Sequence, residues 1–509
     1  MTINIDKLKN TEYDYCIIGA GPTGLTISYL FSKIGKKCIL IDKNKDIGGC
    51  HRVDRVNGLF TEHGPRIYSS SYVNTKNILK LMNTDFNKLF TEYNFTISNI
   101  GNRTVKHFTY RELSYFIYHF ILLLFDENYG IDVSMKEFME MRNFTNETKD
   151  YIDRLCRLTD GASSDRYSLN KFFQLVNQQL FHKVYQPKKP NDIGIFKLWK
   201  EKLYENNVDI LLDIEVVCLD GNVNNVENIL LSCNQSENRN YFKIKSKKYI
   251  FCIPPKHLEI ILSRKSINGI SYENAFGDYT LINKWINKTD YMNYIPIVFH
   301  WDYTYKQKFK EENILPKIWG FPVTEWGVAF IVLSNYMDFN DTRSSIVIST
   351  CITKNVKSTY INKTPDECDE NELKQETLRQ LRISFPNLPN PSYSIIHPSV
   401  RYIDNKWIED DTAFISSSKS KYLKYNSDTV NNIYQVGTQN GNSKYRFTSM
   451  ESAISNAIVF SNNIEKDTQK TIKIKYIFDL VSILKISIFI IICFLFLYFT
   501  RIKYIKNYK

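Results

Sequence analysis

A glycine-rich turn near the start of the chain has the residue types and spacing of a dinucleotide-binding site. Its residues are Gly19, Ala20, Gly21 and Gly24, set between an apolar run at 15–18 and a helix-like run at 24–34. In such a strand–turn–helix unit the first glycine allows the tight turn, the second lets the backbone approach a pyrophosphate, and the third lets the helix pack on the strand. The first N–H groups of the helix then attract the phosphates.

An acidic residue follows the second predicted strand at the spacing that such a ligand requires. The apolar run at 37–41 ends on Asp42, and a carboxylate about 20 residues after the glycines is the usual partner of the adenosine ribose. We expect Asp42 to accept hydrogen bonds from the ribose hydroxyls. On the pattern alone, an ordinary strand–turn–helix without a ligand stays open as the alternative.

Length and composition describe a folded protein of more than one domain. At 509 residues the chain is longer than the roughly 250–300 residues that one core serves, and 43% of its residues are hydrophobic. The net charge of +12 is spread along the chain, without a dense basic block interleaved with aromatic residues. We therefore expect no nucleic-acid partner.

The ten cysteines are scattered, and no two form a C-x-x-C pair. Several, including Cys16 and Cys252, lie inside apolar runs, where cysteine behaves as a small hydrophobic residue. This usage suits a reducing compartment and predicts neither a disulfide framework nor a metal site. The polar residues 1–14 lead directly into the first strand, so we expect no N-terminal signal peptide.

The last apolar segment of the chain is suited to a lipid bilayer. Residues 486–499 are almost entirely apolar, and extension back to Leu480 gives the ~20 residues that span a membrane. Basic residues from Arg501 onward close the segment, and Lys485 lies near enough to its start for the side chain to snorkel to the interface. We expect a single-pass C-terminal tail anchor over 480–500, with the preceding domains in the cytoplasm. A buried helix of a soluble protein is the alternative.

Periodicity along the chain predicts the elements that position these residues. They are a hairpin over 53–66, mainly helices over 75–186, strands at 210–218 and 248–253, a β-rich stretch over 283–353, a strand at 432–436 and a helix at 449–464. The strand at 248–253 stops at Pro254-Pro255, because proline cannot continue a central strand. The strand at 432–436 leads into Gly437.

These features together resemble the flavin amine oxidase superfamily, which also contains UDP-galactopyranose mutases, desaturases and protoporphyrinogen oxidases. The resemblance rests on the glycine fingerprint, Asp42, the pair Gly48-Gly49, the strand before Pro254-Pro255, and the strand, loop and helix around Gly437. It implies FAD, not NAD, as the cofactor. It also implies an α/β fold, in which a Rossmann-like FAD-binding domain (a parallel sheet with helices) is interleaved with a mixed α+β substrate domain and followed by the transmembrane helix.

The same resemblance divides the chain into separate blocks. The FAD-binding parts are 12–75, 191–260 and 426–465; the substrate domain is a helical insert at 76–190 and a β-rich insert at 261–425; a linker at 466–479 precedes the helix at 480–500.

The resemblance also assigns contacts to the cofactor beyond the first glycines. Gly48 and Gly49 would pass close to FAD, and Arg52 would neutralise phosphate, although many amine oxidases have arginine directly after the glycine pair. Val216 would meet the adenine through its backbone. Gly437, Thr448 and Met450 would meet the ribityl chain and the pyrimidine end, where a helix N-terminus stabilises negative charge on the reduced ring.

Three residues are candidates for contact with the reacting groups. His63 and Arg66 lie in the stretch 60–68, which resembles a loop that runs under the flavin in the mutases. Tyr445 lies in Lys444-Tyr445-Arg446-Phe447, which resembles the mutase segment where a tyrosine meets substrate phosphate. Each also has a structural interpretation: His63 as a buried hydrogen-bonded histidine, Arg66 as a partner of FAD phosphate, and Tyr445 as a packed loop residue.

The resemblance implies an FAD-dependent oxidoreductase of the amine oxidase type. An amine or lipid-like small molecule would transfer a hydride to flavin N5 at the membrane surface. Two alternatives stay open: a flavin-dependent isomerase of a sugar nucleotide, similar to UDP-galactopyranose mutase, and a flavin-binding membrane protein without catalytic activity. The oligomeric state is unknown.

Overall fold

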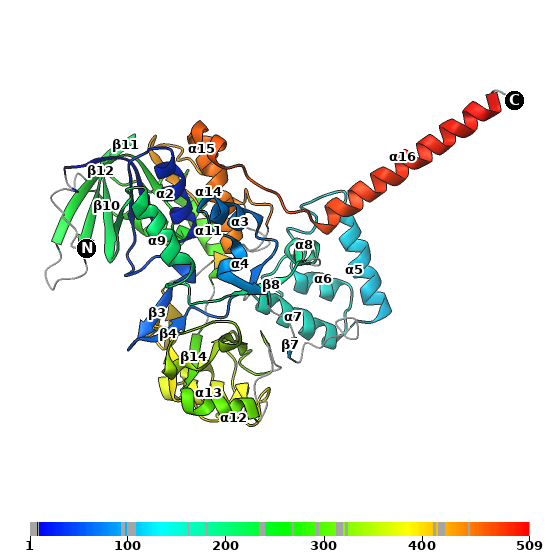
Figure 1. The fold of residues 1–509 in the computed structure, drawn as a ribbon, viewed down its shortest axis with the longest axis horizontal. Coiled ribbons are helices and arrows are strands. Elements are labelled where there is room, and N and C mark those ends of the chain that lie inside the picture. The colour runs from blue at the N-terminus through cyan, green and yellow to red at the C-terminus, as the bar shows by residue number, and fades with distance from the viewer. Residues whose placement is uncertain are drawn as a thin grey trace.

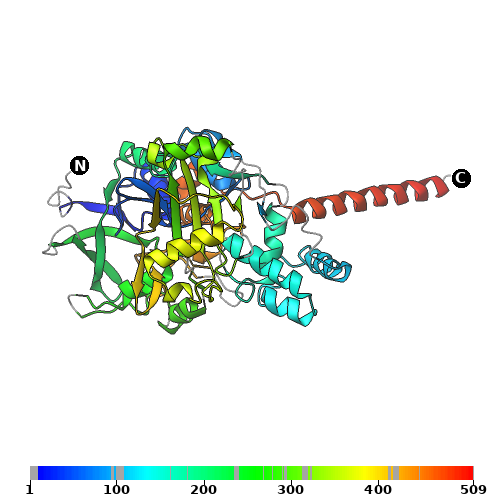
Figure 2. The same cartoon turned by 90° about the horizontal axis from the view of Figure 1, so that it is seen from below.

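The computed structural model describes most of the chain, and the text below concerns those residues. They are 8, 10–92, 97–98, 108–160, 162–179, 182–233, 240–266, 269–277, 279–288, 290–291, 295–311, 319–320, 324–410, 414–415, 423–445 and 448–507. A long C-terminal helix projects from a body built around two large sheets (Figures 1 and 2).

A seven-stranded mixed sheet carries the glycine-rich turn. Its strands are β1 (Glu12–Ile18), β2 (Cys38–Ile41), β9 (Asp209–Leu211), β10 (Ile214–Asn222), β11 (Asn225–Cys233), β12 (Asn240–Phe251) and β22 (Ile433–Gln435). The order is β10-β11-β12-β1-β2-β9, and β22 pairs with the end of β12. The pairs β12–β1, β1–β2, β2–β9 and β12–β22 are parallel, whereas β10, β11 and β12 form an antiparallel meander. The predicted Rossmann-like α/β fold is confirmed.

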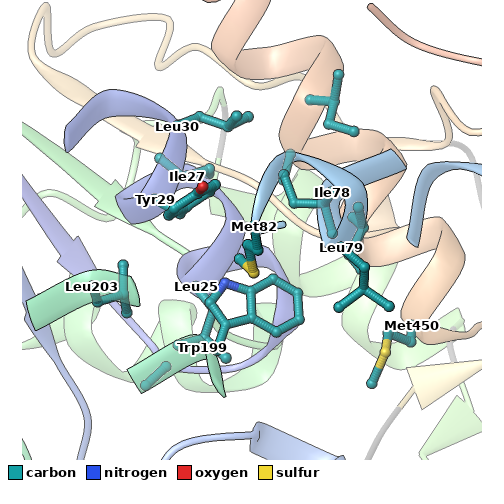
Figure 3. Packing of buried hydrophobic residues seen from close by; sticks show 14 of the residues in the cluster. Leu25, Ile27, Tyr29, Leu30, Ile78, Leu79, Met82, Trp199, Leu203 and Met450 are labelled. Atoms are coloured by element: carbon teal, nitrogen blue, oxygen red, sulfur yellow. The ribbon is translucent and has the colours of Figure 1, made fainter. Parts of the chain in front are cut away.

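Helices cover one face of the parallel strands. Alternate strand residues such as Ile17, Leu40 and Ile250 belong to the apolar cluster on this face. The helices there are α2 (Pro22–Lys33), α3 (Val73–Leu81), α9 (Ile195–Glu205) and α14 (Met450–Ile464). Figure 3 shows their side chains meeting, with Trp199 of α9 close to Met82. Because both faces of a parallel sheet are buried, its strands read as continuous apolar runs.

The antiparallel meander covers the opposite face. The other alternate residues, such as Cys16, Ile18 and Ile39, are buried in a cluster with side chains of β10, β11 and α10 (Pro255–Ser263). Helix α10 begins on Pro255, the first helical position, where the missing N–H of proline costs no hydrogen bond. The predicted break at Pro254-Pro255 is thus the change from β12 to α10.

A helical insert lies beside this domain. Its helices are α5 (Tyr110–Leu122), α6 (Met135–Met141), α7 (Asn146–Asp160) and α8 (Leu169–Gln179). Thr109 with Glu112, and Ser134 with Glu137, form capping boxes that begin α5 and α6. The insert has its own apolar cluster, centred on phenylalanines such as Phe116.

A second sheet, of six strands, forms the rest of the body. Its order is β18 (Tyr393–Ile396), β14 (Ile295–Trp301), β17 (Ile346–Ile352), β16 (Ala329–Val332), β15 (Trp319–Gly320) and β7 (Ile97–Ser98), with α12 (Tyr303–Glu311) and α13 (Glu370–Leu381) as its nearby helices. The predicted hairpin is β3 (Val53–Val56) and β4 (Leu59–Glu62). It turns at Asn57 and Gly58, both at positive φ, and Phe60 packs with Val298 of this sheet. Smaller sheets are formed by β5 (Tyr68–Ser69), β8 (Val184–Pro187) and β6 (Phe90–Glu92), and by β19 (Val400–Ile403) and β20 (Lys406–Glu409).

The single strand expected at 210–218 is wrong. The chain forms two strands, β9 beside β2 and β10 beside β11, separated at Asp213, whose φ is +61°. A left-handed residue redirects the backbone, and apolar periodicity carries no sign of it. The N–H of Asp213 donates to the carbonyl of Asn44, 2.9 Å away, which holds the bend beside the end of β2.

The C-terminal segment is the helix α16 (Leu480–Asn507), preceded by α15 (Lys466–Thr471) inside the predicted linker. Its part from Leu480 to Arg501, 22 residues, is long and apolar enough to cross a bilayer, and very little of it is buried. Twenty-two residues rise about 33 Å, slightly more than the hydrocarbon thickness of ~30 Å.

A buried carboxylate joins α14 to α3. Glu451, in the first turn of α14, accepts hydrogen bonds from the backbone N–H groups of Asn74 and Thr75, both 2.8 Å long, and from their side chains. These two N–H groups lie in the first turn of α3, whose N-cap residue, Tyr72, makes no side-chain cap. Glu451 therefore caps a helix that lies far from it in the sequence. Burial raises its pKa, and the hydrogen bonds oppose that shift.

Replacement of Glu451 by alanine should destabilise the fold. The N–H groups of Asn74 and Thr75 and the hydroxyl of Thr75 lose the acceptor that Glu451 provides, which corresponds to about 2–4 kcal/mol of unfolding free energy. Urea denaturation of the full chain in detergent, followed by circular dichroism, measures this. The control is Glu201→Ala, at an exposed position on α9, which should change the value by less than about 0.5 kcal/mol. Equal effects of the two substitutions would contradict the capping role.

Candidate functional site

A cavity of about 440 Å³ lies at the carboxyl ends of the parallel strands. This edge of an open α/β sheet is where ligands bind. Its lining comes from three separated parts of the chain: the region after β1 and β2, the region of β10 and α10, and the region after β22. Most of the residues predicted to contact FAD line it, namely Gly19, Gly21, Asp42, Gly49, Val216, Gly437, Thr448 and Met450.

The three glycines of the turn differ in what a side chain at each position would meet. Gly19 has a φ of +104°, and a Cβ there would lie 2.5 Å from the carbonyl oxygen of Cys252. A Cβ on Gly24 would lie 1.9 Å from the carbonyl oxygen of Gly19, which confirms that this glycine lets the helix pack on the strand. A Cβ on Gly21 would meet only Gly49 Cα, at the ordinary distance of 3.7 Å. Protein packing therefore requires Gly19 and Gly24, whereas Gly21 leaves space at the cavity.

The pair Gly48-Gly49 forms the other side of the turn. The N–H of Gly48 donates to the carbonyl of Ala20, 2.8 Å away, and Gly48 itself has a φ of +122° against the ring of Phe196. A Cβ on Gly49 would lie 3.0 Å from Gly21 Cα. The two glycine segments can approach this closely because neither carries a side chain at the contact. Gly49 lines the cavity, whereas Gly48 packs against Phe196 outside the lining.

Asp42 connects the end of β2 to the glycine-rich turn. One carboxylate oxygen accepts from the N–H of Ala20 at 2.6 Å, and the other accepts from the N–H of Asn44 at 2.8 Å. The side chain is nevertheless part of the cavity lining. These two bonds fix the orientation of the carboxylate at the cavity.

Two helix N-termini point at the cavity. Helix α2 begins after Gly21 with Pro22 at its first position, and it has no side-chain cap and no acidic residue in its first turn. Helix α14 begins after Ser449, and Met450 is its first residue. Both starts lie in the lining. The first N–H groups of α2 have no side-chain cap, whereas at α14 the side chain of Ser449 accepts from the N–H of Ser452. Each N-terminus carries a partial positive charge, so two parts of one elongated ligand could be stabilised as anions.

The end of the cavity around Val216 is lined by α10. Arg264, which follows α10, donates to the carbonyls of Val216 and Val217 and to the carboxylate of Glu215. It lines the cavity together with Ile260. The sequence reasoning missed the α10 residues, although Pro254-Pro255 marks the start of a helix at the ligand-binding edge of the sheet.

At the other end, Arg66 and His51 line the cavity. Arg66 donates a short hydrogen bond to the carbonyl of Cys50, which holds the guanidinium beside the glycine loop. His51 Nδ1 lies 3.2 Å from the hydroxyl of Tyr68. Burial lowers the pKa of His51 well below its usual value, and the nearby charge of Arg66 adds to the effect. His51 is therefore neutral, and Arg66 is the cation at this end.

Other predicted site residues lie outside the lining. Tyr445 is buried between α3 and α8, where its hydroxyl accepts a 2.6 Å hydrogen bond from Gln179 and its ring meets Tyr72 edge-on. Arg52 is buried and paired with Asp54 at 3.1 Å, so its charge is directed away from the cavity. Arg446 lies outside the described residues.

His63 belongs to a separate buried cluster of ionisable groups. Its Nε2 contacts a carboxylate oxygen of Glu409, at the end of β20, and both side chains are almost fully buried. The ring of His397 lies 5.6 Å from that of His63, and its Nε2 lies 3.1 Å from Asp54. The cluster thus connects the β3–β4 hairpin to the β19–β20 hairpin. Within the described part of the chain, no group of His, Cys, Asp and Glu has the arrangement of a metal site.

Two carboxylates around this cluster have opposite pKa shifts. Burial opposes ionisation of Asp54, but the hydrogen bonds and charges of His397 and Arg52 hold its pKa well below the usual range. Burial raises the pKa of Glu62 to about 7, against a hydrogen bond from Ser349 and the charge of Arg66. Asp54 is therefore ionised at neutral pH, whereas Glu62 is only partly ionised.

Comparisons with known proteins agree with this architecture. Residues 17–83 match the family described as NAD(P)-binding Rossmann-like domain. A 60-residue stretch, 11% of this chain, is 33% identical to UDP-galactopyranose mutase of Mycoplasma pneumoniae and spans 15% of that protein.

Solved structures match over nearly the whole body. A putrescine oxidase bound to putrescine has 12% identity and a TM-score of 0.61, and the match covers 89% of this chain and 99% of that one. Cyclohexylamine oxidase from Brevibacterium oxydans has 12% identity and a TM-score of 0.58, with 89% and 100% coverage. An oxidoreductase from Methanosarcina mazei also has 12% identity and a TM-score of 0.58, with 88% and 99% coverage. The chain therefore has the fold of the flavin amine oxidases.

The glycine analysis predicts different effects of two similar substitutions. Gly24→Ala should destabilise the ligand-free protein by about 3 kcal/mol, because the methyl group overlaps the backbone of the turn. Gly21→Ala should change the unfolding free energy by less than about 0.5 kcal/mol, because the methyl group enters open space. Chemical denaturation of both ligand-free variants provides the measurement. If Gly21→Ala is as destabilising as Gly24→Ala, the space beside Gly21 is not a ligand cavity.

The Asp54 cluster predicts a pH-dependent stability. A depressed carboxyl pKa stabilises the fold above the unfolded-state value of about 3.9, and this contribution is lost as the pH falls towards the lower folded-state value. Asp54→Asn should therefore cost on the order of 2 kcal/mol at pH 7, and the difference from the parent should shrink below about pH 4. Unfolding free energies measured between pH 3 and pH 7 test this, with the exposed Asp132→Asn as the control. A difference that does not depend on pH would rule out the ion-pair explanation.

Proposed function

We propose that this protein is an FAD-dependent oxidoreductase of the amine oxidase type, attached to a membrane by α16. The observation that carries the proposal is the cavity, which the glycine-rich turn, Val216 and the start of α14 build together at the ligand-binding edge of the sheet. The amine oxidase fold across 89% of the chain supports it.

The cavity residues fit FAD in chemical type along its length. Asp42 places a carboxylate in the lining, which suits the adenosine ribose, and the Val216 end is lined by apolar side chains of α10 such as Ile260. The uncapped start of α2 and the open space at Gly21 suit the pyrophosphate. The start of α14 suits the pyrimidine ring, because its partial positive charge favours the anionic reduced form.

Bound FAD would supply the redox chemistry, which is hydride acceptance at flavin N5 from a small-molecule substrate and reoxidation by dioxygen or another acceptor. This chain would bind and orient the reactants. Arg66, held by the Cys50 carbonyl, is the charged group at the proposed flavin end. His63 and Tyr445 do not line the cavity. We propose that they position neighbouring residues through their contacts with Glu409 and Gln179.

The substrate class proposed is an amine or a lipid-like molecule with an oxidisable C–H bond. The relatives named for putrescine and cyclohexylamine favour an amine. The exposed apolar helix α16 favours a substrate that partitions to a membrane. None of the described residues that line the cavity belongs to the six-stranded sheet.

A sugar-nucleotide isomerase is the second candidate. It is favoured by the 60-residue similarity to UDP-galactopyranose mutase. The two activities differ in electron balance. An oxidase consumes its acceptor with each turnover, whereas the isomerase needs reduced flavin and changes no net oxidation state.

The decisive test uses the full chain purified in detergent. The proposal expects bound yellow flavin that bleaches anaerobically with an amine or lipid amine, and peroxide formation in air. Gly21→Ala is the matched control: it should keep the fold and lose most of the flavin, because its methyl group occupies the position of the pyrophosphate. UDP-galactopyranose isomerisation only after dithionite would select the second candidate. Bound flavin without either reaction, across broad panels, would select a protein without catalytic activity. Full flavin content in Gly21→Ala would reject the cofactor assignment.

A further inference from the structure

Helix α5 presents apolar side chains on both of its faces. Its inner face packs in the helical insert through Phe116, which contacts the rings of Phe172 and Phe173 on α8. Its outer face and the residue that continues it are exposed: Tyr110 (94%), Ile117 (54%), Tyr118 (58%), Ile121 (43%) and Phe125 (83%). A contiguous apolar face that is exposed in this way marks a surface that a second apolar environment covers.

The outer residues form one stripe along the helix. Tyr110, Ile117, Tyr118, Ile121 and Phe125 follow the spacing of a single helix face, on which the exposed Ser114 lies between Tyr110 and Ile117. The capping box of Thr109 and Glu112 fixes the residue at which α5 begins. Aromatic residues dominate it, and tyrosine side chains combine an apolar ring with a polar tip.

The stripe lies at the edge of the body from which α16 departs. Val481, in the first turn of α16, belongs to the same apolar cluster as Phe116, and its N–H donates to Asn177 of α8 at 2.8 Å. In Figure 1, α5 runs across the direction of α16 and not along it, and in Figure 2 it lies at the same end of the body. If α16 crosses a bilayer, α5 lies close to the plane of the membrane surface.

The residues just before α16 also expose aromatic side chains, together with lysines. Tyr476 and Phe478 are more than half exposed, and Lys473 and Lys475 beside them are also exposed. Aromatic rings at the headgroup level, with lysines facing anionic lipids, are the usual features of a membrane interface. The edge therefore combines an apolar stripe, exposed aromatic rings and positive charge around one point of insertion.

We propose that the outer face of α5, formed by Tyr110, Ile117, Tyr118, Ile121 and Phe125, lies in the interface of the bilayer as a second attachment beside α16. This inference rests on the proposed membrane attachment by α16. An interfacial helix buries its apolar face at the boundary of headgroups and acyl chains. Two attachments, one across the bilayer and one along its surface, hold the body of the molecule at one angle to the membrane.

Site-directed photocrosslinking in the full chain tests this proposal. The chain is reconstituted in vesicles of phosphatidylcholine and phosphatidylserine, with p-benzoylphenylalanine in place of Tyr118, Phe489 or Tyr241 in separate samples. Phe489 lies within α16, and Tyr241 belongs to β12, a strand that lies on the opposite side of the body from α16 (Figure 1). All three side chains are more than half exposed, so folding should be unaffected, which thermal unfolding checks. Lipid adducts are measured by mass spectrometry.

The expected result is lipid labelling from positions 489 and 118 that exceeds labelling from position 241 several-fold. Labelling from 489 without labelling from 118 would overturn the α5 proposal and leave the membrane anchor intact. Labelling from neither position would overturn both. Crosslinks from position 118 to a second copy of the chain, in place of lipid, would overturn the α5 proposal, because the stripe would then be a protein interface.

Discussion

The parallel pairing of β12 with both β1 and β22 is the constraint on which the site depends. Phe251, the last residue of β12, is in register with Ile18 of β1 and with Gln435 of β22. The backbone continues this register beyond the strands, because the N–H of Cys252 donates to Ile18 and that of Val436 donates to Phe251. Three segments far apart in the sequence thus end at one level. The glycine-rich turn, the start of α10 and Gly437 follow directly, so one register brings the cofactor contacts together.

Once the strands end together, close backbone approach decides the shape of the cavity. Gly19 and Gly24 allow the turn and α2 to fold back on β1, and Gly48 and Gly49 allow a second loop to rest on Gly21. The same packing leaves the starts of α2 and α14 facing one space, although each helix lies in the apolar layer of Figure 3. Glu451 adds to this arrangement, because its carboxylate caps α3 and thereby fixes the position of α14 relative to α3.

Three elements of the fold could be predicted from short stretches of consecutive residues. The strand–turn–helix unit, the hairpin at Asn57-Gly58 and the long apolar helix were predicted because each is encoded within about twenty consecutive residues. His63 could not be placed from its neighbours, since Glu409 comes from the other end of the chain and holds it outside the cavity lining. Tyr445 is similar, because Gln179 of the helical insert binds its hydroxyl. Adjacency to a glycine loop predicts that a residue is near the cofactor, but long-range partners determine where its side chain points.

Helix α8 links the proposed membrane contact to the cavity. Its Asn177 holds both Asp479 and Val481 at the start of α16. The next two residues hold the loop before α14, because Gln178 donates to the carbonyl of Lys444 and Gln179 donates to the hydroxyl of Tyr445. Three consecutive side chains of one helix therefore position the start of α16 and the loop before a cavity-lining helix. A tilt of α16 relative to α8 would strain these bonds, so α8 connects the start of α16 to the segment that leads into α14.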